Sequence, residues 1–147
     1  MPTINRRQPP RIVQSQPNSC WAAVLESWSR VEPTISVQQE SILIRKWGEG
    51  KTCGITPVTK LPQIARVLAL VDGGFRGPEL AAYLTTHLPR SHVFCAFPTG
   101  VTSHAVLIYR FSENGVVSYM DPQVGEYRWD SIRWFSNHRT LGLMRRA

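Results

Sequence analysis

Cys20 is the residue of this sequence best placed to act as a nucleophile. It follows a turn-forming Pro-Asn-Ser segment, residues 17–19. The apolar residues after it recur with the spacing of one helix face, at Trp21, Val24, Leu25 and Trp28. This spacing places Cys20 in the first turn of a helix, with Asn18 or Ser19 as the N-cap. Unpaired N–H groups and the helix dipole at that end stabilise a thiolate, the nucleophilic form of cysteine.

A histidine and an aspartate later in the chain can complete a catalytic group. Residues 103–111 form a β-branched and aromatic run, and the Asn-Gly pair that follows it predicts a hairpin turn. A second strand, residues 116–120, ends at Asp121. Strands of matching length place His104 and Asp121 at the same end of the hairpin. We therefore expect Asp121 to accept a hydrogen bond from one ring nitrogen of His104 and to leave the other facing the sulfur.

Together with one further residue, this set resembles the papain-like cysteine peptidases of the compact bacterial type. The matching features are Gln14, six residues before the cysteine, the Cys20-Trp21 helix start, the strand-borne His104 and the Asp121-Pro122 step. They occur in the expected order, and the resemblance covers the chain from about Val13 to its C-terminus. Related domains occur in bacteriocin-processing transporters and in secreted effector proteases.

The resemblance implies a role for each of these residues. The Gln14 side chain helps to form the oxyanion hole, Cys20 attacks, His104 is general base and acid, and Asp121 orients His104. Gln16 competes with Gln14, and we favour Gln14 because a helix-start cysteine needs a loop of about that length to bring the amide back beside the sulfur. The implied fold is papain-like α+β, with an N-terminal helical lobe whose cysteine helix packs against a C-terminal antiparallel sheet.

The order of the predicted elements leads to the same fold class. After the Cys20 helix, we expect helices at residues 36–47, 62–70 and 79–88, with Ser36 as a cap and Pro78 at a first helical position. A loop is expected at residues 72–74. Strands are predicted at residues 92–97, 103–111, 116–120 and 140–145, with a short helix at 131–137. Helices followed by strands without βαβ alternation predict an α+β fold with an antiparallel sheet.

The length and the N-terminus limit the domain organisation. A chain of 147 residues is long enough for one domain and too short for two ordinary ones. We expect residues 1–12 to form a flexible basic arm and residues 13–147 a single peptidase domain. No apolar stretch approaches the ~20 residues of a membrane span. The basic N-terminus lacks the apolar core of a Sec signal peptide, so we expect synthesis in the cytoplasm, with any secretion by a specialised system.

Cysteine spacing and loop motifs argue against disulfides, metals and cofactors. Cys20, Cys53 and Cys95 are widely spaced and odd in number, which is unlike a disulfide framework. We expect Cys95 to pack in the core and Cys53 to be a spare loop thiol. No C-x-x-C or H-x-x-x-H pair indicates a metal site. Residues 48–52 end like a phosphate-binding loop, but the first glycine of that motif would fall at Arg45, so we expect no nucleotide.

The net charge is +7, from 17 basic and 10 acidic residues. This balance suits anionic partners, but a solvated basic surface is its more usual meaning. No recognition-helix or RNA-binding signature accompanies it, so nucleic acid is not an expected partner.

The expected function is hydrolysis of amide bonds through a thioester. The resemblance implies a bacterial effector or toxin protease with a protein or peptide substrate, and leaves room for an immunity or inhibitor protein as a partner. A deamidase, transglutaminase or peptidoglycan amidase of the same fold, or an inactive peptide-binding module, remain as alternatives.

Overall fold

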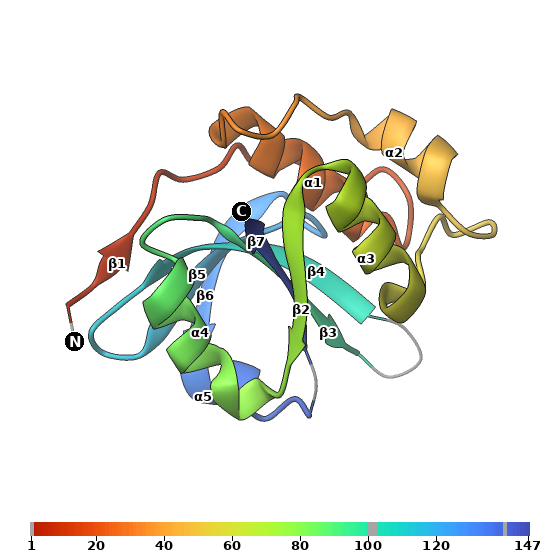
Figure 1. The fold of residues 1–147 in the computed structure, drawn as a ribbon. Coiled ribbons are helices and arrows are strands. Elements are labelled where there is room, and N and C mark those ends of the chain that lie inside the picture. Colours follow the sequence, from red (N-terminus) through yellow and green to blue (C-terminus); the bar gives the residue numbers. More distant parts are fainter. Residues whose placement is uncertain (1, 100–102, 140) are drawn as a thin grey trace.

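The computed structural model describes residues 2–99, 103–139 and 141–147. In this part of the chain, seven strands form one antiparallel sheet in the order β2-β7-β3-β4-β5-β6, with β1 beside β4 (Figure 1). The strands are β1 (Ile4–Asn5), β2 (Leu70–Phe75), β3 (Val93–Pro98), β4 (Ser103–Phe111), β5 (Val116–Asp121), β6 (Glu126–Ser131) and β7 (Leu141–Arg146). The helices are α1 (Cys20–Val31), α2 (Glu40–Trp47), α3 (Pro57–Val67), α4 (Leu80–His87) and α5 (Ile132–Ser136), with a 3-10 turn, η1 (Gly77–Glu79), before α4.

Helix α1 packs on one face of this sheet, as the predicted α+β fold requires. Its four apolar positions, Trp21, Val24, Leu25 and Trp28, are at most 2% exposed, which confirms the helical spacing. They share one core cluster with Phe94 of β3, Leu107 of β4 and Met144 of β7, and with residues of α3. Burial of this stripe holds the first turn of α1, and therefore Cys20, at one end of the central strands.

A second cluster lies between the other face of the sheet and helices α4 and α5. Leu84 of α4 and Phe135 of α5 pack there against Cys95, Val106 and Ile108. Because both faces are covered, residues 93–97 of β3 are all buried and read as one apolar run rather than as an alternating pattern. The central strands that carry the site are thus fixed from both sides.

Helix α2 begins four residues later than predicted, so Ser36 is not its cap. The α1 side chains provide the alternative partners. The Ser29 hydroxyl accepts a hydrogen bond from the Gln38 N–H at 2.9 Å, and the Glu26 carboxylate accepts one from the Glu40 N–H at 2.8 Å. These contacts hold residues 36–39 outside the helix, which is a tertiary effect that local sequence does not encode.

The third predicted helix was misplaced, and a strand after it was missed. Helix α3 starts at Pro57, a favourable first position, and contains Pro62 inside rather than at its start. It ends before Ala69, which has a φ of 56°. The expected loop at residues 72–74 is wrong, because these residues belong to β2 and pair with β7. Glycine has a low strand propensity, so the pairing with β7, rather than the local sequence, determines the extended conformation of residues 72–74.

Strand β6 was also missed, and the bounds of β3, β5, β7, α4 and α5 differ from the predicted ones by one residue. The strand follows a turn closed by Gly125, whose φ is 66°, and pairs along its whole length with β5. The predicted strand start at Thr140 lies outside the described residues.

The N-terminal segment, predicted as a flexible arm, makes extensive contacts with the domain. Strand β1 pairs with the end of β4, and the Arg6 N–H donates to the Tyr109 carbonyl at 2.8 Å. The Arg6 side chain donates to the Pro89 carbonyl at 2.8 Å, and the Ser27 hydroxyl donates to the Pro10 carbonyl at 2.6 Å. In this structure the segment therefore packs along the sheet and α1.

Candidate active site

Cys20 is the first residue of α1 and is only 5% exposed. Ser19 occupies the N-cap position, but its hydroxyl makes no capping hydrogen bond and contacts Gln16 and Glu40 instead. The Cys20 sulfur accepts a hydrogen bond from the Ala105 N–H at 3.3 Å and lies 4.0 Å from the Ser103 carbonyl oxygen. The Ala105 N–H thus fixes the position of the sulfur at the start of α1.

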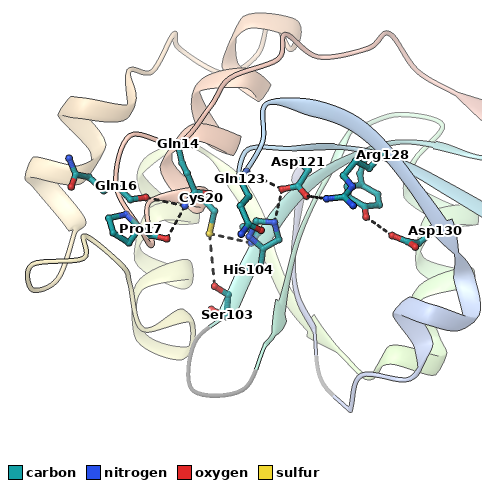
Figure 2. A network of polar contacts seen from close by, with 12 residues as sticks. Gln14, Gln16, Pro17, Cys20, Ser103, His104, Asp121, Gln123, Arg128 and Asp130 are labelled. Atoms are coloured by element: carbon teal, nitrogen blue, oxygen red, sulfur yellow. Dashed lines mark hydrogen bonds and ion pairs between the residues drawn. The ribbon is translucent and has the colours of Figure 1, made fainter.

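His104 extends from β4 toward this sulfur. Its Nε2 lies 2.7 Å from Asp121 Oδ1, and its side chain is also hydrogen-bonded to Cys20 (Figure 2). The ring of Phe97 meets the imidazole edge-on, with 5.6 Å between the ring centroids. The imidazole therefore bridges the thiol and the carboxylate, and its orientation is set by both partners and by an aromatic wall.

Asp121 ends β5 and is 5% exposed. Its Oδ1 also accepts the Gln123 N–H at 3.0 Å, and its Oδ2 lies 3.5 Å from Arg128 Nη1. Burial alone raises the pKa of Asp121, but the bonds from His104 and Gln123, with the charges of His104 and Arg128, outweigh it and hold the pKa below its ordinary value. The carboxylate thus stays ionised beside the imidazole.

The pKa of His104 is governed by two opposing effects. Burial lowers it, but the hydrogen bonds to Asp121 and Cys20 and the charge interactions with both outweigh burial and raise the pKa to about 9. An imidazolium is therefore the dominant form of His104 at neutral pH. A positive imidazolium beside a thiolate is the form in which a cysteine acts as nucleophile and a histidine as proton donor.

The contact between His104 and Asp121 depends on a bulge in the hairpin. Near the turn, Phe111 lies opposite Val117, but nearer the site Leu107 lies opposite Met120, because β4 carries one extra residue at Tyr109. A one-residue shift transfers every side chain beyond it to the other face. The unbroken register expected from strands of equal length would separate His104 from Asp121, and the bulge puts both on one face.

Gln14 lines the same hollow as Cys20 and His104, but its amide is engaged elsewhere. Its Nε2 donates to the carbonyls of Gln16 and Pro17, at 3.0 and 2.9 Å (Figure 2). Its Oε1 is buried and has no partner within the described residues. Gln16 is exposed and contributes its backbone to this loop. In this conformation neither N–H of the Gln14 amide is available to an oxyanion.

Two hollows meet at Cys20 and differ in character. One, of about 850 Å³, has a largely apolar lining from α1, α3 and strands β2, β3, β4 and β7. The other, of about 500 Å³, is polar and is lined by His104, Asp121, Gln14, Arg128 and Trp134, among others. We call them the apolar cleft and the polar cleft. Cys20 lines both of them.

Two residues near the candidate site, Arg128 and Glu40, were not predicted from the sequence. Arg128, which contacts Asp121, lies on the missed strand β6; the turn at Gly125 followed by the alternating segment 126–131 was the signal for it. Glu40 accepts hydrogen bonds from Ser15 and Ser19, in the loop before Cys20. Nothing in the local sequence points to that second contact.

The other two cysteines occupy different environments, one in the core and one in a loop. Cys95 is fully buried in β3, and this burial raises the pKa of its thiol. Cys53 lies in a loop, where its carbonyl accepts the Trp21 indole N–H at 2.9 Å.

Within residues 2–99, 103–139 and 141–147, no group of three or more His, Cys, Asp or Glu side chains is arranged to hold a metal ion. In the same part of the chain, no helix has the length and apolar character to cross a membrane.

Comparison with known proteins supports the fold. The structure matches the peptidase domain of Streptococcus ComA, a bi-functional ABC transporter involved in a quorum-sensing pathway, with a TM-score of 0.67 and 16% sequence identity. The match covers 92% of this chain and 97% of that domain. No protein-family model matches the sequence, and no curated protein matches it. The predicted resemblance to compact bacterial papain-like peptidases is therefore confirmed at the level of the fold.

Proposed function

We propose that this protein, which shares the fold of a transporter peptidase domain, is a cysteine peptidase that acts through a thioester on Cys20. The observation that carries the proposal is the chain of contacts from Cys20 through His104 to Asp121. This arrangement joins a nucleophile, a proton donor and acceptor, and an orienting carboxylate, all in contact and at the meeting point of two clefts.

In the first half of the reaction, the Cys20 thiolate attacks the carbonyl carbon of an amide. The tetrahedral intermediate collapses as the C–N bond breaks, and the imidazolium of His104 gives its proton to the leaving amine. The acyl group remains on the sulfur as a thioester. Asp121 keeps the imidazole in the orientation that this transfer needs.

In the second half, neutral His104 takes a proton from water as the oxygen attacks the thioester. The C–S bond breaks, the carboxylic acid product leaves, and the thiolate–imidazolium pair is restored. Each step uses groups that the structure places in contact, and the only co-reactant is water.

The developing oxyanion requires donors beside the first turn of α1. The Cys20 N–H has no acceptor within its own helix and is the first of them. Gln14 is the second donor. One of its amide N–H groups must first break its hydrogen bond to the carbonyl of Gln16 or Pro17. Loss of one such donor typically costs ~10²–10³ in rate, so we expect Gln14→Ala to slow turnover by that factor.

A screen for cleaved proteins tests the proposal and requires no identified substrate. Cys20→Ser removes the nucleophilic sulfur at nearly constant size, and Cys53→Ala is the matched control for loss of a thiol. Mass spectrometry should find new protein termini with the wild type and with Cys53→Ala, but not with Cys20→Ser. An electrophilic peptide probe should label Cys20 in preference to Cys53 and Cys95. Equal cleavage by wild type and Cys20→Ser would contradict the proposal.

The same screen separates the alternatives. A deamidase would leave the mass change of an amide converted to an acid, and a transglutaminase would leave cross-links; an amidase would release peptide from cell wall. An inactive module would bind peptides without changing them. The setting in an effector or toxin, with a specialised export route and an immunity or inhibitor protein, remains a prediction from the sequence resemblance. Expression of active and Cys20→Ser protein in bacteria, compared for toxicity, tests that setting.

A further inference from the structure

The position of His104 indicates which cleft holds each side of the substrate. The leaving amine must receive its proton from His104, so this part of the substrate lies on the side of the sulfur where His104 lies. His104 lines the polar cleft and is not among the residues that line the apolar cleft. The acyl part of the substrate, which stays on Cys20, therefore occupies the apolar cleft. This step rests on the proposed function.

The floor of the apolar cleft is a row of small residues that crosses four strands. Ala105 of β4 lies opposite Ala96 of β3, Ala96 opposite Gly142 of β7, and Gly142 opposite Gly74 of β2. Leu61 of α3 borders the row at Gly142, where an added Cβ would lie 3.0 Å from the Leu61 Cδ1. The row begins at the sulfur, because the Ala105 N–H donates to Cys20.

The length of this row can be expressed as a number of residues of an extended substrate. Neighbouring strands lie about 4.8 Å apart, so the three steps from Ala105 to Gly74 span roughly 14 Å. An extended peptide advances about 3.3 Å per residue. The cleft therefore reaches about four residues from the scissile bond, at the level of strand β2.

Asp72 stands at that far end. It lies two residues before Gly74 on the same face of β2 and lines the cleft. Its carboxylate has no hydrogen-bond or ion-pair partner among the described residues, and burial raises its pKa. The second carboxylate of the cleft, Glu49, is engaged with the N–H of Thr56 at 2.5 Å.

The charge of the cleft is opposite to that of the whole protein. The chain carries a net charge of +7. Among the described residues that line the apolar cleft, however, two are acidic and none is Lys, Arg or His. A cation on the substrate would therefore meet no basic side chain among these lining residues.

From this geometry we propose that the apolar cleft selects acyl-side peptide segments that carry a basic residue about three to four positions before the scissile bond, paired with Asp72. The intervening residues lie over the floor of small residues. Asp72 is thus a specificity-determining residue for the proposed reaction.

The test measures selectivity separately from turnover. Peptides with Lys, Ala or Glu at each acyl-side position in turn are compared for kcat/KM with the wild type, and for binding with Cys20→Ala, which needs no catalysis. We expect Lys to be favoured over Glu at the third or fourth position by fivefold or more. Asp72→Asn should remove the preference and Asp72→Lys should reverse it. Salt at 1 M, a concentration that shortens the Debye length to about 3 Å, should weaken the wild-type preference.

Glu113→Lys is the matched charge reversal outside the cleft, in the exposed β4–β5 turn, and should leave the preference unchanged. Selective binding to Cys20→Ala without turnover by the wild type would refute the proposed function and keep the cleft assignment. An unchanged preference in Asp72→Lys, or no preference for Lys in either assay, would overturn the cleft assignment.

Discussion

Glu40 and Ser19 are joined by a hydrogen bond of 2.9 Å between the carboxylate and the hydroxyl. The same carboxylate oxygen accepts the Ser15 N–H at 2.8 Å, and the Ser19 oxygen accepts the Gln16 N–H at 3.0 Å. The first residue of α2 therefore holds the loop that carries Gln14 and ends at Cys20. Glu40 touches no reacting atom, and its contribution would be to position those that do.

We predict that Glu40→Ala lowers kcat by about tenfold with little change in KM, because a loosened loop misplaces oxyanion donors that act in the transition state. Glu40→Gln keeps an acceptor oxygen and should recover part of the loss. Steady-state kinetics on a substrate found by the cleavage screen measures both. An equal change in Glu113→Ala, or a change confined to thermal stability, would show that Glu40 has only a structural role.

The rate should fall on the alkaline side as His104 loses its proton. With a pKa of about 9 in the free protein, His104 remains able to protonate the leaving amine up to that pH, and kcat/KM should decline above it. In Asp121→Asn the negative partner is lost, so the decline should begin at lower pH. The pH dependence of kcat/KM for both proteins measures this shift. An alkaline limb at the same pH in both would contradict the assigned pairing.

A different histidine should govern stability on the acid side. His92 is 2% exposed; its Nε2 lies 2.7 Å from the Arg7 carbonyl, and its Nδ1 lies 3.4 Å from Arg6 Nε. Burial lowers the pKa of His92 below its ordinary 6.5, against the raising effect of the Arg7 bond. A lowered histidine pKa means that protons bind the unfolded chain more readily, so stability falls as the pH drops below about 6.5.

We therefore expect the unfolding free energy of the wild type to decrease between pH 7 and pH 5, as measured by urea titration. His92→Gln carries no ionisable group there and should show a smaller decrease. The comparison uses the difference between the two pH values, so a general loss of stability in the variant does not affect it. Equal decreases in both proteins would rule out His92 as the source.

Ala69 should be a site where glycine stabilises the fold. Its φ of 56° lies in the left-handed region, which costs an L-residue roughly 1–2 kcal/mol, and its side chain is exposed. Ala69→Gly should raise the unfolding free energy by about 0.5–1 kcal/mol after the entropy of the freer unfolded chain is subtracted. Ala82→Gly, at an exposed position inside α4, should lower it by about 1 kcal/mol. Changes of the same sign would contradict this explanation.

Local patterns were enough to locate the candidate catalytic residues of this molecule. Apolar spacing placed Cys20 at a helix start, and the Asn-Gly turn located the hairpin that carries His104 and Asp121. Such features depend on residues a few positions apart, whose propensities act over one turn or one strand pair. The α+β class followed from the order of those elements.

The arrangement of that chemistry depends on contacts between distant residues. The extra residue at Tyr109 places His104 and Asp121 on the same face of the sheet. The segment that carries Arg128 forms a strand because it pairs with β5. Glu40 reaches the loop before Cys20 only after α2 packs beside α1. Strand register, bulges and long-range hydrogen bonds take the form that packs best in the whole fold, so short stretches of sequence do not specify them.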